Sequence, residues 1–307
     1  MKPNVIVIAG PTASGKTKLS IELAKQINGE IISSDSMQIY KWMDIGTAKV
    51  TKEEAEGIKH YLIDIIEPNE RYTVSNFKKD AEHAIEEILS KGKIPIVVGG
   101  TGLYIDSLIY GIEYQDMKFD EEYRIKLMEQ AETEKGLNQL YNQALEIDKQ
   151  AMEKISPNDT KRIIRILEIY HSTGKTKTEL EIESRKNGVK YNYQVFVVNM
   201  DREKLYERIN LRVDMMIDAG LIDEVKNICN RYNSFPTAMQ GLGYKEVVEY
   251  LENKISKEEM IDKIKKESRH YAKRQLTWFR KDKDFIWLDG LADVGQNVGI
   301  IREEVKI

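Results

Sequence analysis

Short apolar runs alternate with helical patterns along much of this chain. Runs of the length and composition of buried strands occupy residues 5–9, 30–33, 61–66, 94–98, 194–199 and 285–288. Between two of the early runs, residues 74–91 carry apolar side chains at helical spacing. Strands that alternate with helices predict a parallel sheet with helices on both faces, so we expect an α/β fold.

The pattern changes between residues 113 and 190. Strand-like runs disappear there, and polar helical segments rich in Glu, Lys and Gln take their place. We therefore expect a helical insertion domain at 113–190. The α/β core would then consist of residues 1–112 and 191–307, with helices toward its C-terminal end.

A glycine-rich loop follows the first apolar run and fits the pattern G-x-x-x-x-G-K-[ST]. A strand before it and a helical pattern after it argue against an unrelated glycine-rich turn. The loop amides and the helix N-terminus would form an anion cradle, with Lys16 on the outer phosphates and the Thr17 hydroxyl on Mg²⁺. This motif predicts a P-loop NTPase-like sheet and a phosphate site made by Gly10, Pro11, Thr12, Ala13, Ser14, Gly15, Lys16 and Thr17.

Composition and charge narrow the class of protein further. Hydrophobic residues make up 41% and charged residues 32% of the 307 positions, as in soluble globular proteins. Cys229 is the only cysteine, which excludes a disulfide framework and a cysteine-rich zinc site. No apolar run approaches the roughly 20 residues of a membrane helix. We expect a cytoplasmic protein without membrane contact.

Positive charge is concentrated near the C-terminus. Residues 261–283 contain nine Lys or Arg and three Asp or Glu, whereas the whole chain has a net charge of −4. Such a segment is typical of a polyanion-binding surface, and a solvated helix face is the alternative.

Two polar segments follow strands close to the phosphate loop. Residues 33–40 read SSDSMQIY and residues 99–104 read GGTGLY. Asp35 is the carboxylate that clearly follows a strand there. It could bind Mg²⁺ in the outer sphere, through a water molecule, or act as a general base. Arg208 and Arg212 lie four residues apart, so they share a helix face. They could bind a diphosphate or pair with surface carboxylates such as Glu207 and Asp218.

Six motifs occur in an order that resembles one family. They are GPTASGKT, SSDSMQIYKWMDIGTAK, VVGGTGLY, SPNDTKRIIRILEIYHSTGKT, GLGYKE and AKRQLTWFR. Together they are similar to the bacterial tRNA dimethylallyltransferases, also called tRNA isopentenyltransferases. The resemblance implies transfer of a five-carbon prenyl group from dimethylallyl diphosphate to N6 of the adenosine immediately 3′ of the anticodon. It also implies Mg²⁺ as cofactor and a tRNA anticodon stem-loop as partner, and we expect a monomer.

The resemblance also implies roles for particular residues. Asp35 would accept the proton of the attacking amine, while Lys16, Thr17 and Arg212 would stabilise the departing diphosphate; Arg208 is the weaker candidate. Gln38 has an amide suited to an adenine edge. The implied tRNA contacts are Asp35, Ser36, Met37, Gln38, Thr101, Arg124, Thr160, Lys161, Arg162, Ile163, Ile164, Gln240, Gly241, Leu242, Gly243, Tyr244, Lys245, Lys273, Arg274 and Arg280.

Three other functions share some of these features. A small-molecule kinase would have the same loop and fold, but the basic C-terminal segment and the long helical insertion argue against it. An adenylate isopentenyltransferase would use free AMP as the acceptor. A non-catalytic RNA-binding protein would bind tRNA without needing Lys16 or Asp35.

Overall fold

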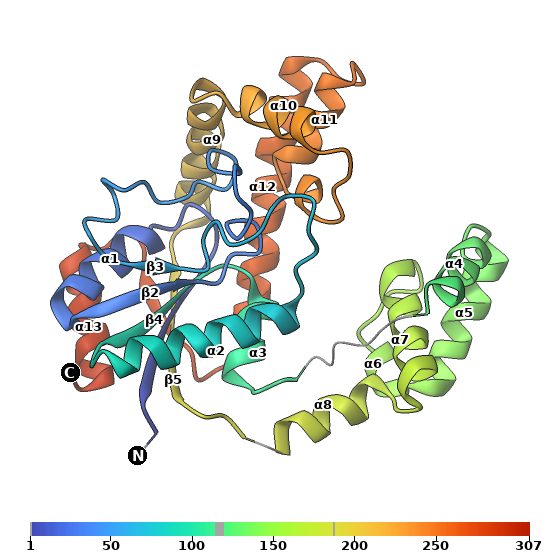
Figure 1. Cartoon of the computed structure of the whole chain (residues 1–307), viewed down its shortest axis with the longest axis horizontal. Helices are drawn as coiled ribbons and strands as arrows, with labels where there is room; N and C mark the ends of the chain where they lie inside the picture. The colour runs from blue at the N-terminus through green and yellow to red at the C-terminus, as the bar shows by residue number, and fades with distance from the viewer. Residues whose placement is uncertain (1, 114–119, 187) are drawn as a thin grey trace. The chain divides into compact units, whose positions relative to one another are not determined.

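The computed structural model describes residues 2–113, 120–186 and 188–307. Residues 114–119 and 187 of the predicted insertion, and residue 1, lie outside the described part. The chain divides into two compact units, one formed by residues 1–109 and 190–307 and the other by residues 110–189 (Figure 1). The insertion had been predicted at 113–190.

The first unit is built on one six-stranded sheet in which all neighbouring strands are parallel. Its strands lie in the order β3-β2-β4-β1-β5-β6. The α/β class predicted from the alternating pattern is therefore confirmed. The strands are β1 (Asn4–Ala9), β2 (Gly29–Ser33), β3 (His60–Tyr61), β4 (Ile94–Gly99), β5 (Asn192–Asn199) and β6 (Ile286–Asp289).

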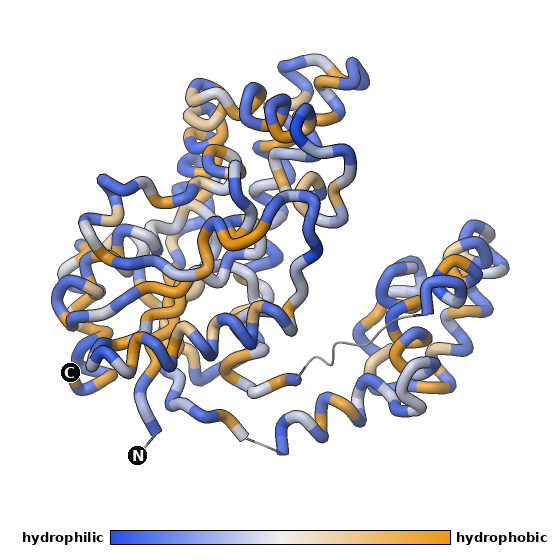
Figure 2. Tube along the Cα trace, in the orientation of Figure 1, coloured by the Kyte–Doolittle hydropathy of each residue, from blue (hydrophilic) through white to orange (hydrophobic). Residues whose placement is uncertain are grey.

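Side chains of each central strand alternate between two apolar layers, as the period of two in a strand requires. In β1, Val5 and Val7 pack with α2 (Val74–Ser90) and α3 (Gly102–Ile109). Ile6 and Ile8 point the other way, toward the layer that contains α1 (Lys16–Ile27) and α13 (Val294–Val305). Because both faces are covered, the strands are apolar almost throughout (Figure 2).

The predicted strand at 61–66 is wrong beyond its first residue. β3 ends at Tyr61, and Leu62 and Asp64 adopt left-handed backbone conformations with φ of 60° and 57°. An extended strand cannot pass through such angles. Residues 64–66 instead donate backbone hydrogen bonds to residues 38 and 39, and this pairing fixes the segment that follows β2.

Further helices of the first unit surround a third apolar cluster. Ile39, Tyr40 and Met43 contribute to it from the segment after β2. The helices of this part of the unit are α9 (Arg202–Asp218), α10 (Leu221–Arg231), η1 (Ala238–Gln240), α11 (Tyr244–Leu251) and α12 (Lys257–Phe279).

The second unit is helical in its described part. Its apolar core includes Leu127, Leu140, Ala144, Ile163 and Leu167. The helices are α4 (Glu121–Gln130), α5 (Glu134–Ile147), α6 (Lys149–Met152), α7 (Thr160–Thr173) and α8 (Lys177–Lys186). Across all the described residues of both units, none of the helices combines the length and apolarity that crossing a membrane requires.

The strand order predicts where a ligand binds. β1 lies in the middle of the sheet, between β4 on one side and β5 on the other, and the strands that follow β1 in sequence are added first on the β4 side and then on the β5 side. In open α/β sheets, ligands bind beyond the carboxyl ends of the strands at such a reversal. The glycine-rich loop leaves β1 at this point.

Phe77 tests the layer between the sheet and α2. Its ring is fully buried and stacks on Tyr104 with 4.2 Å between centroids. We expect Phe77→Ala to lower the free energy of unfolding by about 3–5 kcal/mol, because it leaves a cavity in a packed core. Leu211→Ala, at a position 62% exposed, should change it by about 0.5 kcal/mol or less. Urea unfolding followed by circular dichroism measures both, and equal losses would contradict this packing.

Candidate active site

The glycine-rich loop folds into the expected turn between β1 and α1. Gly10 has φ 143°, and a Cβ there would lie 2.5 Å from the Val198 carbonyl oxygen. Gly15 has φ 96° and precedes the first residue of α1. Only glycine tolerates both the backbone angles and the close approach. The loop therefore presents its amides and the N-terminus of α1 at the end of β1.

Lys16 is the first residue of α1, and its side chain folds back against the loop. Its Nζ donates hydrogen bonds to the Pro11 carbonyl oxygen at 2.5 Å and to Ser14 Oγ at 3.4 Å. Burial, assisted by the positive charge of Arg212 and opposed by Asp35, lowers the pKa of Lys16 to about 7. An anion in the cradle would restore the charged form.

Arg212 reaches the same place from α9. Its Nη1 lies 3.4 Å from Thr12 Oγ1, and burial lowers the pKa of the guanidinium from its usual value. Arg208 is exposed one turn earlier, and its Nη2 would lie 3.7 Å from a Cβ at Gly15. Glu207, one of the suggested surface partners, pairs with Lys204 instead. The helix thus directs Arg212 toward the phosphate loop.

Asp35 follows β2 and is held in a tight turn. Its Oδ1 accepts hydrogen bonds from the backbone N–H of Met37 at 2.8 Å and of Gln38 at 3.3 Å. Since the turn uses Oδ1, Oδ2 is the oxygen that could accept a proton. The next residue, Ser36, donates its N–H to Thr101 Oγ1 at 3.1 Å, which ties this turn to the GGT segment after β4.

A cavity of about 390 Å³ connects these groups. Such a volume is typical of a small-molecule site. One wall is formed by Ile209, Val213, Met216 and Ile264 and is apolar. The predicted residues that line the cavity are Thr12, Lys16, Thr17, Asp35, Ser36, Met37, Gln38, Arg212, Gln240, Gly241, Leu242, Gly243, Tyr244, Lys245 and Arg274.

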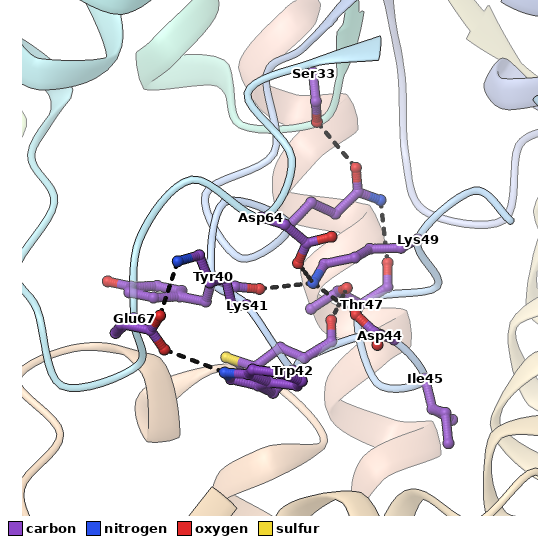
Figure 3. Close-up of polar contacts among 12 residues, drawn as sticks. Ser33, Tyr40, Lys41, Trp42, Asp44, Ile45, Thr47, Lys49, Asp64 and Glu67 are labelled. Atoms are coloured by element: carbon purple, nitrogen blue, oxygen red, sulfur yellow. Dashed lines mark hydrogen bonds and ion pairs between the residues drawn. The ribbon is translucent and has the colours of Figure 1, made fainter. Parts of the chain in front are cut away.

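Gln38 is already engaged within the protein. Its Oε1 accepts from Ser33 Oγ at 2.9 Å, and its Nε2 donates to the Thr47 carbonyl oxygen at 3.2 Å. An adenine edge would have to replace part of this arrangement. The following segment is anchored by Lys49, whose Nζ contacts the Tyr40 carbonyl oxygen, Asp44 and Asp64 at 2.5–2.7 Å (Figure 3).

Other predicted tRNA contacts lie elsewhere in the first unit. Lys273 is exposed on α12, one residue before Arg274. Arg280 follows the last residue of α12 and lines a separate hollow with Trp287 and Asp289. These two cations therefore do not line the main cavity.

The remaining predicted contacts belong to the second unit. Thr160, Lys161 and Arg162 begin α7, but Ile163 and Ile164 are buried in the core, so they cannot offer their side chains to RNA. Beneath this surface, Glu168 is only 2% exposed and pairs with Arg124 at 2.9 Å.

The sequence reasoning missed several cavity residues on α12. Gln275 joins two loops: its Oε1 accepts from the Thr12 N–H at 3.0 Å and its Nε2 donates to the Gly100 carbonyl oxygen at 2.9 Å. Glu267, Ser268 and Tyr271 line the cavity from the preceding turns. Burial, with the nearby Asp35 charge, raises the pKa of Tyr271 to about 12. These residues and Gln275 recur every three or four positions, so they share one face of α12. Polar side chains at that spacing interrupt an apolar stripe, and this was the available signal in the sequence.

The donor groups around the cavity suit a metal ion that arrives with a phosphate. No group of three or more His, Cys, Asp or Glu that could hold an ion occurs among residues 2–113, 120–186 and 188–307. Mg²⁺ usually binds one or two protein oxygens and takes its other ligands from water and phosphate. The exposed Thr17 hydroxyl and the Asp35 carboxylate fit such a site.

Comparison with known proteins identifies the family of this chain. Residues 38–282 match the sequence model of the family described as IPP transferase. The chain belongs to this family. A tRNA dimethylallyltransferase of Acetivibrio thermocellus is 55% identical over 287 residues, covering 93% of this chain and 91% of that protein. The corresponding protein of Lachnoclostridium phytofermentans is 50% identical and covers 100% of this chain and 97% of its own length.

Solved structures of the IPP transferase family share the fold. The full-length tRNA isopentenylpyrophosphate transferase of Bacillus halodurans is 41% identical, with a TM-score of 0.74, and the match covers 100% of this chain and 96% of that one. A eukaryotic dimethylallyltransferase acting on tRNA is 32% identical, with a TM-score of 0.83, and the match covers 99% and 80% of the two chains.

The low pKa of Lys16 predicts proton uptake when a diphosphate binds. Burial and the charge of Arg212 hold that pKa to about 7, and the negative charge of a bound anion would raise it. Near pH 8, binding should therefore take up part of a proton, and affinity should fall as pH rises above 7; near pH 5.5 Lys16 is already charged, so its contribution vanishes. Titration calorimetry with inorganic pyrophosphate, in buffers of different ionisation enthalpy, measures this uptake.

Lys16→Arg is the control for the same experiment, because arginine stays charged and the ligand's own titration remains. The difference in uptake between wild type and variant near pH 8 reports Lys16. Equal uptake by both proteins would contradict the shifted pKa.

Proposed function

We propose that this protein transfers a dimethylallyl group from dimethylallyl diphosphate to N6 of the adenosine 3′-adjacent to the anticodon of tRNA. Diphosphate is released. The single observation that carries the proposal is that one cavity joins an anion cradle to a carboxylate. Lys16 and Arg212 lie at the cradle beyond β1, and Asp35 follows β2, which β4 separates from β1 in the sheet. Family membership supports tRNA as the acceptor.

The chemistry suits these side chains. The bond between the allylic carbon and the diphosphate oxygen breaks while N6 forms a bond to that carbon. Negative charge grows on the leaving group, where the loop amides, Lys16 and Arg212 are fixed in advance. Mg²⁺ on the diphosphate, with Thr17 as its protein ligand, would add positive charge there. The apolar wall at Ile209 and Val213 would shelter the prenyl carbons.

We assign to Asp35 the removal of the proton from the attacking amine. Adenine N6 is a weak nucleophile because its lone pair is delocalised into the ring. Transfer of one N6 proton to Asp35 Oδ2 leaves a neutral secondary amine as product. General base catalysis of this kind typically contributes about 10²–10⁴-fold.

The acceptor base must leave its stack to reach this cavity. Unstacking costs a few kcal/mol, which contacts to the extruded base partly offset. The tRNA-binding residues outside the cavity would supply the remaining grip, including those of the second unit, which we propose is the insertion domain for tRNA. We also propose that the protein acts as a monomer on cytoplasmic tRNA.

Nucleoside mass spectrometry tests the function directly. Unmodified tRNA incubated with the protein, Mg²⁺ and dimethylallyl diphosphate should gain one dimethylallyl group on the adenosine next to the anticodon. Parallel reactions contain ATP in place of the prenyl donor, or AMP in place of tRNA. ADP formation without tRNA modification would instead indicate a kinase. Prenylation of AMP at the same rate as tRNA would indicate an adenylate isopentenyltransferase.

Asp35→Asn separates catalysis from binding. The amide oxygen can keep the turn hydrogen bonds made by Oδ1, but the side chain no longer accepts a proton. We expect the transfer rate to fall by about 10²–10⁴-fold, with the affinities for tRNA and pyrophosphate within a few-fold of wild type. Single-turnover kinetics and equilibrium binding measure the two quantities. A collapse of tRNA binding at unchanged single-turnover rate would show that Asp35 mainly docks the RNA.

The start of α7 tests the contribution of the second unit. Arg162 and Arg165 lie three residues apart with half-exposed or exposed side chains. Replacing both by Ala should weaken tRNA binding and reduce the slope of log affinity against log salt by about 1 for each lost phosphate contact. Lys175→Ala, which removes a cation paired with Glu183 in the same unit, is the matched control. An unchanged slope would mean that this face of α7 does not meet the phosphates.

A further inference from the structure

Two loops that are far apart in the sequence form one side of the cavity. Gly46, Thr47 and Ala48 come from the segment after β2, and residues 240–245 run from the end of η1 through a turn into the start of α11. Neither loop belongs to the sheet. Their shape therefore depends on contacts between the loops and the helices around them.

Glu224, in the first turn of α10, supplies the central contact. Its Oε2 accepts hydrogen bonds from the N–H groups of Asp44 at 2.8 Å and Ile45 at 2.7 Å. Its Oε1 accepts from the Gly46 N–H at 3.1 Å and from the Tyr244 hydroxyl at 2.6 Å. Three successive backbone N–H groups form an anion-binding concavity. Here a carboxylate of the protein occupies it and joins the first loop to the second.

A glycine allows the first loop to touch Tyr244 beside this carboxylate. A Cβ at Gly46 would lie 2.5 Å from the ring of Tyr244, which is fully buried. In the second loop, a Cβ at Gly241 would lie 2.9 Å from Met37 Sδ, in the segment that leads to the first loop. The contact at Gly46 leaves no room for a methyl group, so a shift of the first loop displaces Tyr244.

The Glu224 contacts are separate from those that hold the phosphate side. Lys49 anchors the far end of residues 38–49 through Asp64 and the Tyr40 carbonyl oxygen (Figure 3). Gln275 joins the phosphate loop to Gly100. Loss of the Glu224 contacts should therefore release residues 44–46, while Gln38 still holds the Thr47 and Ala48 carbonyl oxygens. The anion cradle should stay in place.

We propose that Glu224 is a positioning residue for the acceptor base. It fixes residues 44–46 against Tyr244, and the wall formed there receives the base that Asp35 deprotonates. The proposal rests on the proposed function for the identity of the acceptor. Glu224 therefore acts on the part of the cavity that receives the acceptor base, and not on the part that binds the diphosphate.

Glu224→Gln tests the assignment, because it keeps the size of the side chain but turns an N–H toward one of the backbone donors. Hydrogen bonds to a charged group are lost, so kcat/KM for tRNA should fall by about tenfold or more. KM for dimethylallyl diphosphate and the Kd for inorganic pyrophosphate should stay within about twofold, and the Tm should stay within a few degrees of the wild-type value. Tyr244→Phe removes one of the four hydrogen bonds and should give a smaller loss of the same kind.

Asp223→Asn is the matched control, since this exposed carboxylate precedes Glu224 on the same helix. It should leave all these constants unchanged. Gly46→Ala, which displaces the Tyr244 ring, provides a second route to the same loss if Glu224→Gln folds poorly.

Unchanged tRNA constants in Glu224→Gln and Gly46→Ala would overturn the proposal, as would equal losses for both substrates with a lowered Tm. Equilibrium binding of tRNA and of pyrophosphate distinguishes this failure from a failure of the proposed function. If the wild-type protein bound tRNA but transferred no prenyl group, the proposed function would fail. The selective loss of tRNA affinity in Glu224→Gln would still support the role of Glu224.

Discussion

Lys16 and Arg212 bring two positive charges into one cavity, where burial removes much of the water that would stabilise them. Burial lowers the pKa of both side chains, and the neighbouring charge of Arg212 lowers that of Lys16 further. Asp35 is close enough to offset part of this repulsion. A like-charged pair in a desolvated site is costly until an anion neutralises it. The site is therefore suited to a ligand with several negative charges, and a diphosphate meets that requirement.

The same constraint explains why the chain surrounding the cavity is so tightly fixed. Preorganised donors stabilise a developing anion because they need no rearrangement when the charge appears. At the phosphate side, Gln275 bridges two loops, and its side-chain amide lies so close to Gly100 that a Cβ at position 100 would not fit. At the other side, Glu224 fills a backbone concavity and holds two loops together. One fold thus provides a charged half for the leaving group and a separately supported half for the acceptor.

Much of this arrangement could be predicted from local sequence. Five of the strand-like runs, the glycine-rich loop and the position of Asp35 depend on short-range patterns, and the structure places them as expected. The strand predicted at 61–66 was wrong beyond Tyr61 because Leu62 and Asp64 adopt left-handed backbone conformations and residues 64–66 bond to residues 38 and 39, which composition does not reveal. Gln275 was missed because its partners, Thr12 and Gly100, are distant in sequence. Ile163 and Ile164 lie within a motif predicted to contact RNA, but the helix directs their side chains toward the core of the second unit, where they are buried.

If the cradle accepts diphosphate as a leaving group, then carbon, and not phosphorus, is transferred. Dimethylallyl diphosphate labelled with oxygen-18 at the atom bridging carbon and phosphorus distinguishes the two. After one turnover with tRNA, all of the label should be in the released diphosphate, because the carbon–oxygen bond breaks. Label retained on the five-carbon product would mean that a phosphorus–oxygen bond had broken, as in a phosphoryl-transfer enzyme, and would contradict the role of diphosphate as the leaving group.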